Sequence, residues 1–439
     1  MVNKAWKIGL VLAAAFASIP LMAQTEPPAV DPQVQKEVIA AVAMHQQGNT
    51  AGAISALEVV YRKDSSNVDA VNWLGYLYMK SGSPEKAVPM LSRAVELQPD
   101  STAARHNLAL AYMNSGRTPE AVIGFEDLMA RSPDNGDYAA TLGSLYIKAK
   151  SLDRAIPVLE KAHKLRPNDQ VVMTNLASAL IETKQEQKAV PVFEALLKAD
   201  AENDLALRWL GYIHVMNNRS DQAVAMLEKA RTIRPRDLEV LNNLGNAYVQ
   251  MGDDAKALEV YTEIADLNPN LFQAWYNIGS IQLQKNRYPE AAEAFRKSVG
   301  IQPNDAFSHN NLGRAYEEMN RPTSSADSYM KAADLAPENK TFSRNAGLAL
   351  FRDRRDDDAI AYIERALAQG VDEPDVKLVL AEIYSRKGRH MDAIKLLEPL
   401  SGQMENSLTY WFNLGVLREK TTDQAGAETA YRRALAIDP

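Results

Sequence analysis

The stretch Leu241–Pro269, LNNLGNAYVQMGDDAKALEVYTEIADLNP, decides the fold of this chain of 439 residues. Its apolar residues fall at helical spacing in two successive segments. Gly252 lies between the segments, where the chain needs a turn, and Pro269 stops the second segment. The stretch therefore predicts two helices joined by a short turn.

The same landmarks return every 34 residues along most of the chain. Twelve units follow one another without insertion or deletion, and the last unit stops at its 32nd residue. One helical hairpin cannot bury its apolar face alone, whereas stacked hairpins build a continuous core. We therefore predict an all-α solenoid of about twelve helical hairpins over residues 34–439, with units that begin at Val34, Val68, Thr102, Gly136, Gln170, Asp204, Leu238, Phe272, Ala306, Lys340, Pro374 and Leu408.

Three positions of the unit carry the packing. Position 8 is glycine in eight units and alanine in the other four, and position 20 is alanine everywhere except at Ser325. Position 24 is large and apolar in every unit. Small residues let the two helices of a hairpin cross closely, and a large residue there would overpack the crossing at a cost of about 1–3 kcal/mol.

These landmarks resemble the tetratricopeptide repeat, whose 34-residue pattern runs Trp, Leu-Gly, Tyr, then Ala, Phe and Pro. One unit shows the pattern most fully, with Trp275, Ile278, Gly279, Ala291, Phe295 and Pro303. The resemblance covers residues 34–439. It implies a right-handed superhelix with a concave groove lined by the first helix of each unit, and a protein-interaction scaffold rather than an enzyme.

In that family, positions 2, 5, 9, 12 and 13 of the first helix face the groove, together with position 6. Position 6 is asparagine in seven units, four of them consecutive. A side-chain amide both donates and accepts hydrogen bonds, so a row of amides suits the backbone of an extended peptide. The predicted partner-binding groove comprises Asn242, Asn243, Asn246, Tyr276, Asn277, Asn310, Asn311, Arg314, Arg344 and Asn345. The alternative is that asparagine is common at this position in the family and that the face is merely solvated.

The N-terminus has the pattern of a secretory signal. Lys4 and Lys7 precede an apolar run of 16 residues, and the small residue Ala23 marks a cleavage point. The run is short for a membrane span of about 20 residues. We predict a signal peptide over residues 1–23, a proline-rich lead-in over residues 24–33, a secreted, periplasmic protein, and no transmembrane span in the mature chain.

Composition excludes several classes of protein. The net charge of −7 argues against a nucleic-acid partner, and the absence of cysteine removes disulfides, thiol catalysis and cysteine-bound metals. No phosphate-binding glycine loop or HExxH motif occurs, and the six histidines occupy six different repeat positions. We therefore predict no catalytic residues, no metal site and no cofactor.

The most direct interpretation is a scaffold that binds an extended segment of a protein or peptide partner. A carbohydrate-facing role in envelope assembly is an alternative, with Trp209, Tyr212, Tyr276 and Phe307 as stacking surfaces. A regulatory or targeting arm for a separate enzyme is another, similar to the repeat arm of O-GlcNAc transferases. The last unit would expose Tyr431, Leu435 and Ile437, which predicts self-association through that end or a truncated sequence.

Overall fold

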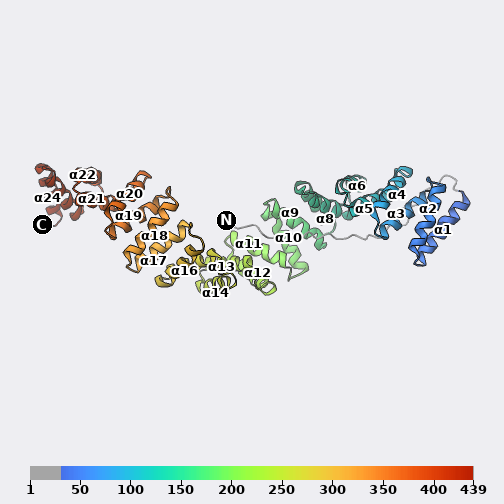
Figure 1. Cartoon of the computed structure of the whole chain (residues 1–439), viewed down its shortest axis with the longest axis horizontal. Helices are drawn as coiled ribbons and strands as arrows, with labels where there is room; N and C mark the ends of the chain where they lie inside the picture. Colours follow the sequence, from blue (N-terminus) through green and yellow to red (C-terminus); the bar gives the residue numbers. More distant parts are fainter. Residues whose placement is uncertain (1–30, 439) are drawn as a thin grey trace. The chain divides into compact units, whose positions relative to one another are not determined.

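The computed structural model describes residues 31–438, which form helices joined by short turns and contain no strand (Figure 1). The prediction of an all-α fold built from helical hairpins is confirmed. The chain divides into two compact units, Met1–Asn217 and Asn218–Pro439. The predicted signal peptide and residues 24–30 of the lead-in lie outside the described residues. No helix within residues 31–438 has the length and apolar character needed to span a membrane.

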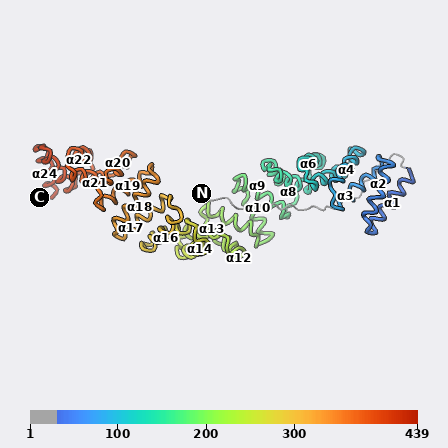
Figure 2. The backbone as a smooth tube through the Cα atoms, viewed as in Figure 1, coloured from blue at the N-terminus to red at the C-terminus, as the bar shows by residue number. Residues whose placement is uncertain are grey.

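The first unit is a stack of antiparallel helices in which each helix packs on the next along the chain (Figures 1 and 2). Its helices are α1 Pro32–Gln46, α2 Thr50–Lys63, α3 Val68–Lys80, α4 Pro84–Leu97, α5 Thr102–Asn114, α6 Thr118–Arg131, α7 Gly136–Lys148, α8 Leu152–Leu165, α9 Gln170–Glu182, α10 Glu186–Ala199 and α11 Asp204–Met216.

The second unit repeats this arrangement. Its helices are α12 Ser220–Ile233, α13 Leu238–Met251, α14 Asp254–Leu267, α15 Phe272–Gln284, α16 Tyr288–Ile301, α17 Ala306–Glu318, α18 Pro322–Leu335, α19 Lys340–Arg352, α20 Asp356–Ala368, α21 Pro374–Arg386, α22 His390–Leu397, the 3-10 turn η1 Glu398–Leu400, α23 Leu408–Lys420 and α24 Gln424–Ile437.

The first helices begin where the repeat count places them. From α3 to α23 each begins at the first residue of its repeat, whereas α1 begins at Pro32, two residues before Val34. The residue before the helix supplies the reason in most repeats. Asn67, Asp237 and Asn339, for example, cap the first turn by accepting a backbone N–H with the side chain.

The turn between the two helices of a hairpin uses left-handed backbone at position 15 of the repeat. Glycine takes this conformation at five repeats, Gly82 and Gly252 among them. The other seven repeats place a residue with a side chain there: Lys150, Lys184, Asn218, Asn286, Asn320, Arg354 and Thr422. Left-handed backbone favours glycine and asparagine, so the sequence reveals this turn only where those residues occur.

The landmark residues pack as their sizes require. A Cβ added at Gly279 would lie 2.9 Å from the ring of Phe295, and one at Gly245 would lie 2.7 Å from the ring of Tyr261. Both rings are almost fully buried. Position 8 must therefore be small because the residue at position 24 of the same hairpin lies directly against it.

A tyrosine–glutamate hydrogen bond joins neighbouring repeats at four places. The tyrosine is at position 11 of a first helix and donates its hydroxyl to a glutamate 20 residues earlier, on the preceding second helix. A lysine or arginine lies over each ring, as Arg154 does 4.6 Å from the centroid of Tyr146. The pairs are Tyr78–Glu58, Tyr146–Glu126, Tyr248–Glu228 and Tyr384–Glu364.

These bonds predict an alkaline transition. Burial, reinforced by the accepting glutamate, raises the pKa of Tyr78, Tyr146 and Tyr384 from 10.0 to about 12. A raised pKa means that the stabilisation is complete below pH 10 and is lost as the pH rises towards 12. We expect Tyr146→Phe to lower the free energy of unfolding by about 1 kcal/mol and to reduce the tyrosinate absorbance that appears late in an alkaline titration.

Tyr112 provides the matched control for this prediction. It occupies the same repeat position, but Ser92 stands where the other pairs have glutamate. Tyr112→Phe should therefore leave the unfolding free energy nearly unchanged at neutral pH. Equal destabilisation by the two substitutions would show that ring packing, and not the hydroxyl–carboxylate bond, links the repeats.

Candidate partner-binding surface

The ten predicted groove residues lie on four first helices of the second unit, α13, α15, α17 and α19. Arg314 is exposed, and Asn243 is buried with 7% of its surface accessible. The other eight are half-buried: Asn242, Asn246, Tyr276, Asn277, Asn310, Asn311, Arg344 and Asn345. The asparagines at position 6 therefore occupy four consecutive repeats, but Asn243 contributes little accessible surface.

A chain of hydrogen bonds joins the side chains of α15, α17 and α19. Asn311 Nδ2 donates to the hydroxyl of Tyr276 at 3.3 Å, and Asn310 Nδ2 donates to Asn311 Oδ1 at 3.3 Å. Asn345 Nδ2 donates to Asn310 Oδ1 at 3.0 Å, and a guanidinium N–H of Arg344 donates to Asn345 Oδ1 at 3.3 Å. We call these five residues the amide chain. It places polar side chains from three consecutive repeats in one connected row.

Tyr261 extends the polar row towards α13. This tyrosine lies on the second helix of the repeat that contains α13, and its hydroxyl donates to Asn246 Oδ1 at 2.7 Å. Burial raises the pKa of Tyr261, and a side-chain hydrogen bond with Asn277 opposes that rise. The phenol thus bridges an asparagine of α13 and an asparagine of α15, and it stays neutral at physiological pH.

The amide chain leaves hydrogen-bonding capacity unused. A primary amide has two N–H donors and an oxygen with two acceptor positions. Within the chain, Asn311 and Asn345 each donate once and accept once. Each therefore keeps one donor and one acceptor, which is what a peptide unit of a bound segment requires. The internal bonds also hold the amides in place, so a ligand need not order them.

Charges at the C-terminal end of the row are mostly paired. Arg344 forms ion pairs with Glu373, which precedes α21, and with Asp375 at 3.9 Å. Glu317 accepts from the hydroxyl of Tyr329 at 2.8 Å and also pairs with Arg352. Arg314 differs, because it has no ion pair or hydrogen bond with any described side chain.

The aromatic residues named for the carbohydrate alternative fall into two separate groups. Trp209 and Tyr212 belong to the first unit and meet edge to face at 5.7 Å between ring centroids. Tyr276 and Phe307 belong to the second unit, where Tyr276 lies 5.8 Å from Phe295. Phe307 is 59% exposed. Of these four side chains, only Phe307 presents most of its ring to solvent.

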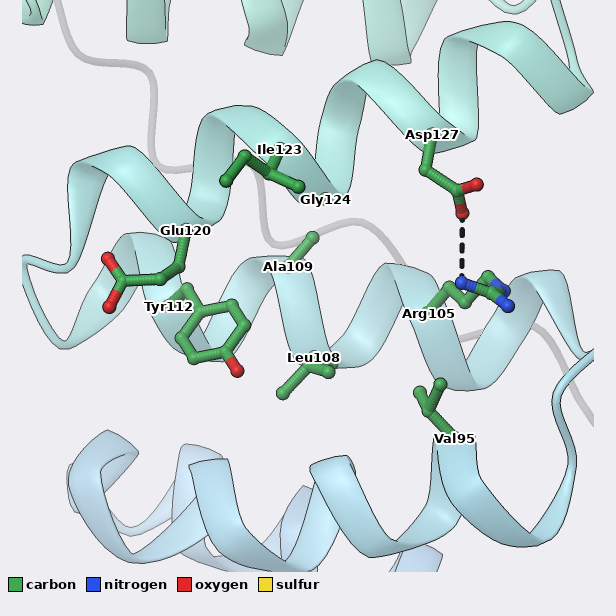
Figure 3. Close-up of a pocket in the computed structure, with 9 residues that line it drawn as sticks. All are labelled: Val95, Arg105, Leu108, Ala109, Tyr112, Glu120, Ile123, Gly124 and Asp127. Carbon is green, nitrogen blue, oxygen red and sulfur yellow. Dashed lines mark hydrogen bonds and ion pairs between the residues drawn. The ribbon is translucent and has the colours of Figure 1, made fainter.

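A hollow of about 260 Å³ opens in the first unit between α4, α5 and α6 (Figure 3). Its charged rim is already paired, because Arg105 bonds Asp127 at 3.2 Å and Glu120 bonds Arg117 at 2.5 Å. None of the predicted groove residues lines it. The lining residues are Val95, Arg105, Leu108, Ala109, Tyr112, Glu120, Ile123, Gly124 and Asp127.

Gly124 lies at the close contact of two helices that line the hollow. A Cβ at this position would lie 2.8 Å from the Cβ of Ala109, so α6 approaches α5 closely at this glycine. Other repeats carry a side chain at the same position, such as Met90 and Val158. Beside it, Ile123 is 65% exposed. In the sequence, this hollow is marked only by the glycine at position 23 of the repeat, which is not one of the landmark positions.

The remaining predictions concern chemistry and the last repeat. Among residues 31–438, no group of three or more His, Asp or Glu side chains is arranged to hold a metal ion. In the last repeat, Leu435 is 60% exposed and Ile437 is 37% exposed, while Tyr431 is half-buried and donates its hydroxyl to Glu419 at 2.9 Å. The expected exposure is present for Leu435 and Ile437 and smaller for Tyr431.

Several solved structures are similar to this chain at low sequence identity. MamA from Desulfovibrio magneticus RS-1 is 23% identical, with 38% of this chain and 94% of that chain covered and a TM-score of 0.36. YrrB, described as a TPR protein with an unusual peptide-binding site, is 22% identical, with 43% and 96% covered and a TM-score of 0.38. Naa15/Naa10 bound to HypK-THB is 14% identical, with 92% and 75% covered and a TM-score of 0.43.

Comparison of the sequence with known proteins gives the family directly. No curated protein matches the chain. One family model described as tetratricopeptide repeat matches residues 44–101, 79–145 and 146–210, and a second with the same description matches residues 242–306, 310–374 and 378–439. These segments span most of the sequence, and the chain belongs to the tetratricopeptide repeat family.

Proposed function

We propose that the protein is a non-catalytic scaffold that binds an extended segment of a protein partner along α15, α17 and α19. The observation that supports this most is the amide chain. Consecutive repeats present asparagines that are held by one another and still keep a free donor and a free acceptor. Such side chains bind backbone without requiring a particular sequence, which suits an extended peptide.

Site-specific photo-crosslinking in the native compartment tests this proposal. Phe307 is the best position for p-benzoylphenylalanine, because it is a 59% exposed aromatic residue on α17, the helix that carries Asn310 and Asn311. Glu293 on α16 is the control, since its exposed side chain pairs with Lys297 of the same helix. We expect a discrete adduct with one protein from position 307 and none from position 293.

Two results would oppose the proposal. The same adducts from both positions would show that contact is unspecific. An adduct from neither position would mean that the amide chain is a solvated surface. Soluble glycan addresses the carbohydrate alternative separately, because it should displace a sugar-bearing ligand and leave a peptide-bound adduct intact.

We also propose that the protein acts outside the cytoplasm, in the periplasm. This proposal depends on the N-terminal sequence alone, where Lys4 and Lys7 precede the apolar run and Ala23 precedes Gln24. N-terminal sequencing of the protein purified from its native source should find Gln24 as the first residue. An intact Met1 in the mature protein would contradict the proposed signal cleavage.

A further inference from the structure

One face of α17 displays three kinds of side chain in order along the helix. Phe307, Asn310, Asn311 and Arg314 follow the spacing i, i+3, i+4, i+7, which places them on a single stripe. Phe307 and Arg314 are exposed at the two ends, and the two asparagines of the amide chain are half-buried between them. We call these four residues the α17 stripe.

Arg314, the cation of the α17 stripe, forms no ion pair with a described carboxylate. Neighbouring arginines are bound by carboxylates: Arg344 by Glu373, and Arg352 by Glu317. Arg314 is exposed and has no such ion pair with a described carboxylate, although its charge acts on the nearby hydroxyl of Tyr329 and opposes the rise in the pKa of that tyrosine. A guanidinium presents a planar fork of N–H donors that matches a carboxylate. The C-terminal end of the stripe is therefore ready to receive an acidic group.

Phe307, at the aromatic end of the α17 stripe, packs on a buried ring on one side and is exposed to solvent on the other. The ring of Phe307 meets the buried ring of Phe342 edge to face, with 5.4 Å between the centroids. Because Phe342 is only 4% exposed, the core of the next repeat fixes this contact. An exposed aromatic residue with a fixed base is a typical anchor for an apolar side chain of a partner.

We propose that the partner segment carries an apolar side chain that covers Phe307 and, three residues away, an acidic side chain that binds Arg314. Seven helical steps separate Phe307 from Arg314 by about 10.5 Å. Three residues of a segment in polyproline II conformation span about 9 Å and bring the side chain back to the same face, because this conformation has three residues per turn. The backbone between the two side chains then lies over Asn310 and Asn311, next to the free donor and acceptor of Asn311. This inference rests on the proposed peptide-binding function and adds the chemistry that selects the peptide.

Selection from a random-peptide display library on the full chain tests the motif. Wild type should enrich peptides with an acidic residue three positions from an apolar one. Arg314→Gln should lose the acidic preference and keep the apolar one, and Arg314→Glu should select a basic residue instead. Phe307→Ser should lose the apolar preference alone. A labelled acidic peptide should bind Arg314→Gln at least tenfold more weakly than wild type at low salt.

Two substitutions serve as matched controls. Arg296 is an exposed arginine of α16, and Phe412 is a 53% exposed phenylalanine of α23. Arg296→Gln and Phe412→Ser should select the same peptides as wild type. If either control changes the motif as strongly as its counterpart, the α17 stripe is not the site that reads the peptide.

The outcomes separate this inference from the proposed function. Enriched peptides without an acidic preference, which still compete with the adduct formed at position 307, would overturn the inference and leave peptide binding standing. Failure of wild type to enrich any peptide over bare resin would overturn both. Retention of the acidic preference by Arg314→Gln would assign the carboxylate to another cation.

Discussion

Replacing Phe295 with alanine is expected to lower the free energy of unfolding of the second unit by about 3–5 kcal/mol. The side chain is fully buried, its ring lies against Gly279, and it also contacts Tyr276 edge to face at 5.8 Å. Removing the ring leaves a cavity where α15 and α16 cross. The loss should appear as faster hydrogen exchange in α15, α16 and α17, because repeat stacks open locally between neighbours.

Phe307→Ala provides the matched control for this prediction. It removes the same ring from the next repeat, but this ring is 59% exposed, and a surface substitution of this kind changes stability by about 0.5 kcal/mol or less. Similar exchange rates in the two variants would show that the core of this unit is not built on position 24. Because Phe295 supports Tyr276, its loss should also weaken the N-terminal end of the amide chain.

The fold followed from the sequence because its determinants are local and repeated. Glycine at position 8 against a large residue at position 24 is visible in the sequence, and the structure shows the contact at Gly279 and Phe295. The turn at position 15 was recognisable only at its glycines. Lys150 and Arg354 adopt the same left-handed backbone, although lysine and arginine have no preference for this conformation.

The tyrosine–glutamate bonds have a signal in the sequence that inspection of a single repeat does not show. Wherever tyrosine at position 11 follows glutamate at position 25 of the preceding repeat, the hydrogen bond forms, and this happens four times. Arg418 and Glu398 make an ion pair at the same two positions. The pairing is visible only between adjacent repeats, because its two residues belong to different repeats.

The candidate site was predictable as a set of residues but not as a connected surface. Family positions placed the ten side chains on the first helices. Which amide bonds which depends on rotamers that sequence does not specify, as the bond from Asn345 to Asn310 across 35 residues shows. The same holds for the ion pair of Arg344 with Glu373 and for the exposure of Arg314, which forms no ion pair with a described carboxylate.

Replacing Asn277, Asn311 and Asn345 together with alanine is expected to weaken binding of a wild-type-selected peptide at least a hundredfold. If each amide contributes two hydrogen bonds of about 0.5–1.5 kcal/mol net, three amides contribute roughly 3–9 kcal/mol. The lower limit corresponds to about a hundredfold change in the dissociation constant, since tenfold is about 1.4 kcal/mol. Fluorescence anisotropy of the labelled peptide, titrated with each variant, measures the change.

The chain offers a matched triple variant, because asparagine occupies the same repeat position in three other repeats. Asn107, Asn175 and Asn413 lie outside the consecutive row, and Asn175 donates to Ser144 at 3.2 Å as the row residues donate to their neighbours. Replacing these three with alanine removes the same groups and should change peptide affinity less than twofold. Equal losses for the two triple variants would mean that asparagine at this position supports the repeat fold in general. A loss confined to the consecutive row would mean that the asparagines of α15, α17 and α19 bind the peptide, because the same chemical change elsewhere in the same fold has no such effect.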